Sequence, residues 1–97
     1  MRLELSEDAD RDIVGILQFG AANFGLDRAE AYAASFDDSF ALLLEHPQIG
    51  AIHPEVRPPI HSWPHGSHRI FYDVIGDAVV VQRILHKSVD VVRWIER

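Results

Sequence analysis

The stretch HRIFYDVIGDAVVVQRILH, residues 68–86, decides the fold of this 97-residue chain. Two runs rich in isoleucine, phenylalanine, tyrosine and valine flank the pair Gly76-Asp77. Such a pair is typical of a two-residue turn between antiparallel strands, because its first position tolerates a positive φ. The sequence therefore predicts a β-hairpin made of residues 68–75 and 78–85.

A two-residue turn also fixes the register of the hairpin and the faces of its strands. The expected pairs are Val74 with Val79, Tyr72 with Val81, and Ile70 with Arg83. The face that carries Tyr72 and Val81 is continuously apolar near the turn, so we expect it to contact helices. The other face mixes apolar residues with polar ones and is a candidate docking surface. A bulge would exchange the two faces beyond it.

Two amphipathic helices are predicted ahead of the hairpin, after a short strand over residues 2–5. Ser6 is a suitable N-cap for the first helix, which ends at Gly25. The second begins at Asp27 and ends before Pro47, because the residue preceding a proline avoids the helical region. Their apolar stripes predict an αα-hairpin that covers one side of a sheet.

The remaining segments complete a single α+β domain over residues 1–97. Residues 47–59 contain four prolines and a glycine and predict a loop instead of a central strand. Residues 60–63 predict another strand, and Ser88–Glu96 predict a final helix capped by Ser88. The expected architecture is an antiparallel sheet packed against the αα-hairpin, in the order β-α-α-β-β-β-α.

Composition excludes several classes of protein. With 47% hydrophobic and 25% charged residues the chain is globular, and its net charge of −6 opposes general nucleic-acid binding. Residues 1–55 carry 3 basic and 11 acidic side chains, whereas residues 56–97 carry 6 and 4. No apolar run approaches the length of a membrane span, no signal peptide is recognisable, and cysteine is absent, so we expect a cytoplasmic protein.

Four sequence blocks resemble the ParE branch of the RelE/ParE toxin superfamily. They are HGSHRIFY (residues 65–72), VVVQRILH (79–86), PQIG (47–50) and EVRP (55–58). The resemblance implies a toxin of a type II toxin–antitoxin system that is neutralised by a cognate antitoxin, ParD-like or related. We expect no cofactor. ParE-like members poison DNA gyrase, whereas RelE-like members are endonucleases that cut messenger RNA on the ribosome.

The alternative nuclease activity would depend on Arg69, Arg83 and His86. A metal-free ribonuclease needs a proton-transfer group surrounded by cations, and Arg69 and His86 are expected to share one sheet face. The basic cluster of RelE-like nucleases is thin in this sequence, so we expect a gyrase-binding toxin without catalytic residues. The candidate target-binding residues are then Arg69, Arg83, His86 and Trp94.

Each of these residues also has a purely structural interpretation. Arg69 is suited to pair with Asp73 on the same strand, and Arg83 requires a carboxylate if it faces the core. His86 is suited to bond a backbone carbonyl, and Trp94 to pack in the fold. These structural and functional interpretations stay open at the level of sequence.

Antitoxin binding is expected on the helical hairpin and on the mixed face of the sheet. The candidate residues are Ile13, Leu17, Phe36, Phe40, Phe71 and Val80. Acidic side chains along the helices either face solvent or complement a basic antitoxin segment. His61, His65 and His68 have spacings that zinc tolerates, but neither a carboxylate nor a cysteine lies among them, so we expect no metal site.

Overall fold

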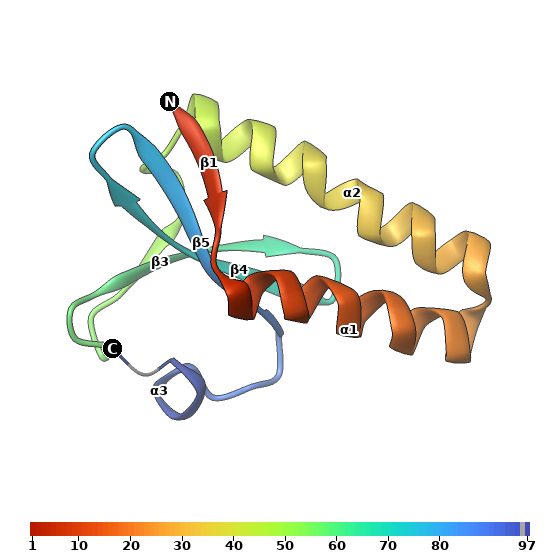
Figure 1. Cartoon of the computed structure of the whole chain (residues 1–97). Coiled ribbons are helices and arrows are strands. Elements are labelled where there is room, and N and C mark those ends of the chain that lie inside the picture. Colours follow the sequence, from red (N-terminus) through yellow and green to blue (C-terminus); the bar gives the residue numbers. More distant parts are fainter. Residues whose placement is uncertain (96) are drawn as a thin grey trace.

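A five-stranded sheet forms the centre of the structure, which is a computed structural model and describes residues 1–95 and 97. The strands lie in the order β1-β5-β4-β3-β2 (Figure 1). Strand β1 runs parallel to β5, and every other neighbouring pair is antiparallel. The strands are β1 (Arg2–Leu5), β2 (Ala51–His53), β3 (Ile60–His65), β4 (His68–Ile75) and β5 (Ala78–His86). The predicted α+β class is confirmed, with a mostly antiparallel sheet.

Strand β2 is an addition to the predicted order. It lies within the proline-rich segment 47–59 and pairs only with β3, at the edge of the sheet. An edge strand tolerates neighbouring prolines, because one side of its backbone needs no partner strand. The prediction that this segment supplies no central strand is therefore confirmed, although three of its residues join the sheet.

The helical hairpin consists of α1 (Glu7–Phe24) and α2 (Leu26–Glu45), which meet at Gly25. Ser6 caps α1 as predicted, because its Oγ accepts a hydrogen bond of 3.0 Å from the Ala9 amide. Gly25 has a φ of +92°, which favours glycine, and α2 begins at the next residue. Both helices extend beyond the strands and join far from the sheet (Figure 1). Among residues 1–95 and 97, none of the helices has both the length and the hydropathy of a membrane-spanning segment.

A β-bulge changes the predicted register of the β4–β5 hairpin. The turn at Gly76 and the pairs next to it, including Tyr72 with Val81, are as predicted. Beyond them Phe71 pairs with Arg83, so β5 has one extra residue and Ile70 pairs with Ile84. The predicted pairing of Ile70 with Arg83 is wrong, because a bulge moves every later residue of β5 to the opposite face.

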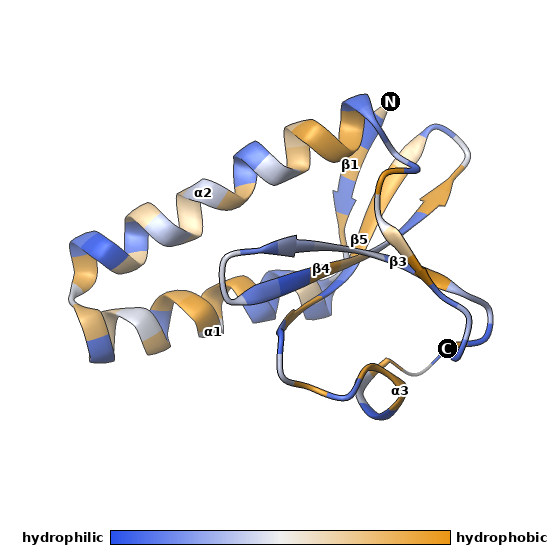
Figure 2. Ribbon diagram, turned by 180° about the vertical axis from the view of Figure 1, so that it is seen from behind, coloured by the Kyte–Doolittle hydropathy of each residue, from blue (hydrophilic) through white to orange (hydrophobic). Residues whose placement is uncertain are grey.

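The sheet separates two apolar clusters. On the face that α1 and α2 cover, called the front face, the buried residues include Phe36, Phe40, Leu43, Ile70, Tyr72, Val79, Val81 and Ile84. On the opposite back face a smaller cluster contains Val56, Ile60, Phe71, Leu85 and Ile95. Figure 2 shows apolar stretches in orange on the strands and on the segment around α3. This segment contributes Ile95 to the back-face cluster. The polar-dotted face predicted as a docking surface is therefore partly occupied by the chain itself.

The final helix is shorter than predicted. α3 spans only Val91–Trp94, and its N-cap is Asp90, whose side chain accepts a hydrogen bond from the Val92 amide. The predicted cap, Ser88, bonds His86 instead. Ile95 leaves the helix and is buried on the back face, at 7% exposure. The predicted end at Glu96 lies outside the described residues.

Candidate functional site: two surfaces joined by an ion pair

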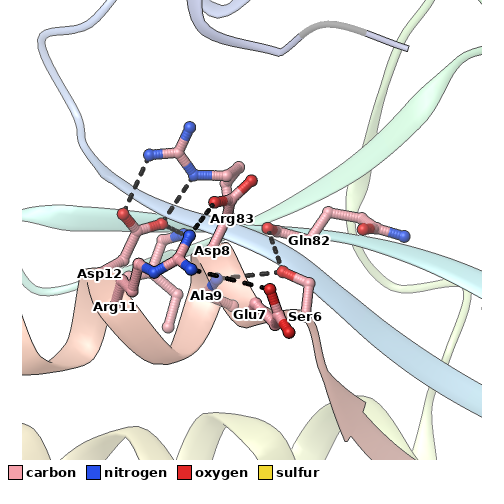
Figure 3. Close-up of polar contacts among 9 residues, drawn as sticks. Ser6, Glu7, Asp8, Ala9, Arg11, Asp12, Gln82 and Arg83 are labelled. Atoms are coloured by element: carbon pink, nitrogen blue, oxygen red, sulfur yellow. Dashed lines mark hydrogen bonds and ion pairs between the residues drawn. The ribbon is translucent and has the colours of Figure 1, made fainter.

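Asp12 of α1 holds the bulged part of β5 (Figure 3). Its Oδ2 accepts hydrogen bonds from Arg83 Nε at 2.8 Å and from the Ile84 amide at 2.9 Å, and its Oδ1 accepts one from Arg83 Nη2 at 2.9 Å. The hydrogen bond to Asp12 raises the pKa of Arg83 above its ordinary value. Arg83 thus forms an ion pair with a carboxylate, as expected for a core-facing arginine, although it lies on the back face.

Ser6 supports the same edge of β5. Its amide donates to the Val81 carbonyl at 2.9 Å, and its hydroxyl donates to the Gln82 carbonyl at 2.7 Å. Strand β1 ends at Leu5, one residue earlier. The beginning of α1 therefore supplies side-chain partners to β5 at the place where the neighbouring strand stops.

The residues of the nuclease interpretation do not meet. Arg69 pairs with Leu85 across the back face and donates to Ser62 Oγ at 3.4 Å. His86 lies on the front face, opposite His68, and its Nδ1 bonds Ser88 Oγ at 2.7 Å. The expectation that Arg69 and His86 share a face is wrong, because the bulge separates them. The suggested pair of Arg69 with Asp73 is also wrong, since Asp73 pairs with Arg97.

Three arginines gather in a cavity of about 360 Å³ on the back-face side, which we call the C-terminal basin. Its lining consists of Asp8, Gln82, Arg83, Arg93, Trp94, Ile95 and Arg97. Arg83 and Trp94, two predicted target-binding residues, lie together here, with the Arg83 Cζ 6.0 Å from the ring centre. The other two candidates, Arg69 and His86, lie elsewhere. Arg93 and Arg97 are not among the site residues predicted from the sequence. The one signal for them in the sequence is their positive charge close to Trp94.

A larger groove of about 760 Å³, the hairpin groove, lies between α1, α2 and the ends of β4 and β5. Its lining residues include Ile16, Phe19, Phe24, Arg28, Tyr32 and His86. Phe19 and Phe24 form an edge-to-face pair 6.4 Å apart and are 65% and 60% exposed. A surface with two exposed aromatic rings favours contact with another apolar surface. Sequence analysis did not single out Phe19, because it lies outside the stripe that packs on the sheet.

The predicted antitoxin-binding residues divide into buried and accessible ones. Phe36, Phe40 and Phe71 are at most 6% exposed and belong to the core. Ile13, Leu17 and Val80 are half-buried. The three half-buried residues therefore have surface available to a partner, as do the exposed aromatic residues of the hairpin groove.

The histidines considered as zinc ligands have other partners. His65 lies between two serines of α2, with Nε2 2.8 Å from Ser35 Oγ and Nδ1 2.6 Å from Ser39 Oγ. His68 Nδ1 is 2.7 Å from the Tyr32 hydroxyl, and His61 stacks on Tyr72. In the part of the chain that the structure describes, no cluster of three or more ligating side chains is suited to a metal ion.

His65 is suited to the neutral state. Ser35 Oγ donates its hydrogen to the Tyr32 carbonyl, so it accepts from His65 Nε2, and His65 Nδ1 accepts from Ser39. Burial lowers the pKa of His65 from 6.5, and burial together with the neighbouring His86 and His65 lowers the pKa of His68. These histidines hold the β3–β4 turn against α2, and the lowered pKa values show that the fold favours their uncharged form.

Acidification is therefore expected to destabilise the protein. Because the histidine pKa of 6.5 falls on folding, the unfolded chain binds more protons below that pH, and the free energy of unfolding decreases as the pH falls. Urea unfolding at pH 7.5 and 5.5 should give a lower midpoint at the acidic value. His65→Gln should reduce this difference and His46→Gln, an exposed control, should preserve it. Equal midpoints at both pH values would contradict the assignment.

Comparison with known proteins agrees with this architecture. Residues 3–91 match the family described as the ParE toxin of the type II toxin–antitoxin system parDE. The toxin ParE1 of Caulobacter vibrioides is 30% identical over 86 residues, which cover 89% of this chain and 88% of that protein. A solved structure of the chromosomal ParDE system from P. aeruginosa shares the fold, with a TM-score of 0.76, 18% identity and coverage of 89% and 95%. The chain belongs to the ParE toxin family of type II toxin–antitoxin systems.

Proposed function

We propose that this chain inhibits growth by binding DNA gyrase and that a cognate antitoxin neutralises it. The observation that carries the choice of mechanism is the separation of Arg69 from His86 by the sheet. Cleavage of RNA by these residues would require an arginine and a proton-transfer group around one phosphate, within hydrogen-bond reach. Arg83, the third residue of that interpretation, already uses two nitrogens on Asp12. A toxin that acts by occupying another protein needs no such cluster.

The hairpin groove is the surface that best fits the antitoxin. Its volume and the exposed rings of Phe19 and Phe24 suit the apolar face of an amphipathic helix. Arg11, Arg28 and the carboxylate of Asp12 also line it, whereas the exposed carboxylates of Asp37 and Asp38 do not. Asp12 is bonded to Arg83, and Arg11 is paired with acidic residues of α1, so Arg28 is the lining cation with no ion pair among residues 1–95 and 97. This distribution favours an antitoxin segment that carries acidic residues beside its apolar face, in contrast to the basic segment expected from the acidic helices.

A supercoiling assay with purified bacterial gyrase and relaxed plasmid tests both parts of the proposal. The parent chain should inhibit supercoiling and accumulate cleaved DNA, and the cognate antitoxin should reverse both effects. Phe19→Asp should still inhibit gyrase but should need about tenfold more antitoxin, because it places a charge in the apolar groove. Ile52→Asp, an equally drastic change of an exposed residue on β2, should be neutralised like the parent.

Two results would contradict the proposal separately. Full supercoiling without cleaved DNA, together with fragmented messenger RNA in expressing cells, would favour the RelE-like nuclease. Equal neutralisation of Phe19→Asp and the parent would place the antitoxin outside the hairpin groove and leave the gyrase target intact.

A further inference from the structure

The C-terminal basin contains more hydrogen-bond donors than the chain itself uses. Arg83 donates hydrogen bonds from Nε and Nη2 to Asp12. Arg97 donates from Nη2 to Asp73 and to the Pro59 carbonyl. Among residues 1–95 and 97, no side chain forms an ion pair with Arg93. Arginine carries five donors, so each of these three guanidinium groups has N–H groups available to a ligand in the cavity.

Two of the arginines are held in place before any ligand arrives. The side chains of Arg83 and Arg97 are only 23% and 15% exposed, and each is anchored by a carboxylate. Asp73 also accepts a hydrogen bond from Gln82 Nε2 at 3.2 Å, which fixes a further lining residue. Such anchoring lowers the entropy lost on binding, because the side chains are already ordered. A planar, charged donor in a fixed orientation is suited to the oxygens of a phosphate.

Trp94 adds a different kind of contact to the same cavity. The residue is 50% exposed and lines the basin beside Arg93, its neighbour on α3. An aromatic ring at a surface with arginines is typical of sites where a planar base stacks and its phosphate is bound alongside. Arg83 lies over this ring, with its Cζ 6.0 Å from the ring centre, so a base would stack on the part of the ring that stays exposed. Together with the arginines, Trp94 offers one partner for a ring and several for an anion.

We propose that the C-terminal basin binds a nucleotide, with the phosphate on the arginines and the base on Trp94. A volume of about 360 Å³ lies at the lower end of small-molecule sites and is suited to one nucleotide. Longer polyanions are disfavoured, because the chain has a net charge of −6 and Asp8 also lines the basin. Stacking accepts any base, so sequence-specific recognition is not implied. This site goes beyond the proposed function, which involves only gyrase and the antitoxin.

Tryptophan fluorescence and calorimetry with the purified full chain test the proposal. AMP should quench the emission and bind, whereas adenosine and inorganic phosphate, each presenting half of the ligand, should bind at least about tenfold more weakly. Thymidine monophosphate and a short oligothymidylate distinguish a free nucleotide from the end of a single strand. Equal affinity per molecule is expected for a site that takes a free nucleotide. Tighter binding of the oligonucleotide would contradict this and would indicate a site for the end of a single strand.

Matched variants distinguish the basin from general electrostatic attraction. Arg93→Gln should weaken AMP binding about tenfold, the effect of losing one charged hydrogen bond, and Trp94→Leu should abolish the quenching. Arg28→Gln removes the same charge from an exposed site on α2 and should leave AMP binding unchanged. The proposal would be overturned by equal losses in the two arginine variants, by no AMP binding at millimolar concentration, or by binding of an oligoglutamate peptide in its place.

Discussion

Replacing Asp12 with alanine is expected to lower the free energy of unfolding by about 3 kcal/mol. The Asp12 side chain is 15% exposed and accepts three hydrogen bonds, two of them from the guanidinium of Arg83. Its removal leaves a largely buried cation without its partner and the Ile84 amide without its acceptor. Both groups then have to recover water or stay unsatisfied, which is costly inside a folded domain.

Urea unfolding followed by circular dichroism measures this effect, with Asp10→Ala as the control. Asp10 lies on the same helix, is exposed, and should change the stability by no more than about 0.5 kcal/mol. If the two variants unfolded at the same urea concentration, the Asp12–Arg83 pair would contribute no more than a surface charge.

Gly50→Ala should have an even larger effect, a loss of about 4 kcal/mol. A Cβ at this position would lie 2.6 Å from the Tyr72 hydroxyl oxygen and 2.7 Å from the Ser62 carbonyl oxygen. The Ser62 carbonyl belongs to β3 and cannot move without disturbing the sheet. Tyr72 is fully buried, donates to the Pro47 carbonyl at 2.8 Å and accepts from the Gly50 amide at 3.0 Å, so displacing its ring breaks both bonds.

Gly15→Ala is the matched control for this substitution. Nothing lies within 4 Å of a Cβ built at Gly15, which is in the interior of α1. There the same change should raise the free energy of unfolding by about 0.5–1 kcal/mol, because alanine favours the helix. Thermal unfolding should therefore move the two variants in opposite directions. A Gly50→Ala protein as stable as the parent would show that the segment 47–50 tolerates displacement.

Local signals explain which parts of the fold could be predicted. Three local signals each specify a backbone conformation: the Gly76-Asp77 pair, the Ser6 cap and Gly25. The β4–β5 turn, the start of α1 and the junction between the helices agree with prediction at these residues. The bulge beyond Tyr72 has no such signal. The residues that bond β5 at the bulge, beyond the end of β1, are Ser6 and Asp12. Both come from the opposite end of the chain. Periodicity within one hairpin carries no information about them.

The error in the candidate site has the same origin. Because one extra residue exchanges the faces of a strand, the misplaced register brought Arg69 and His86 together and placed Arg83 in the core. The positions of Arg93 and Arg97 in the C-terminal basin depend on the path of the chain after Lys87. A helix of four residues is too short to give a clear hydrophobic periodicity in the sequence, so this path could not be predicted. The overall resemblance of the blocks depends on neither detail and identified the family correctly.

The parallel pairing of β1 with β5 has a consequence for how the toxin is made. Arg2 pairs with Ala78, so the first strand has no neighbour until almost the whole chain has been synthesised. At the usual pace of translation, several seconds pass between the emergence of these two segments from the ribosome. An incomplete nascent polypeptide therefore lacks the complete five-stranded sheet, and the cell meets the folded toxin only after synthesis is nearly finished.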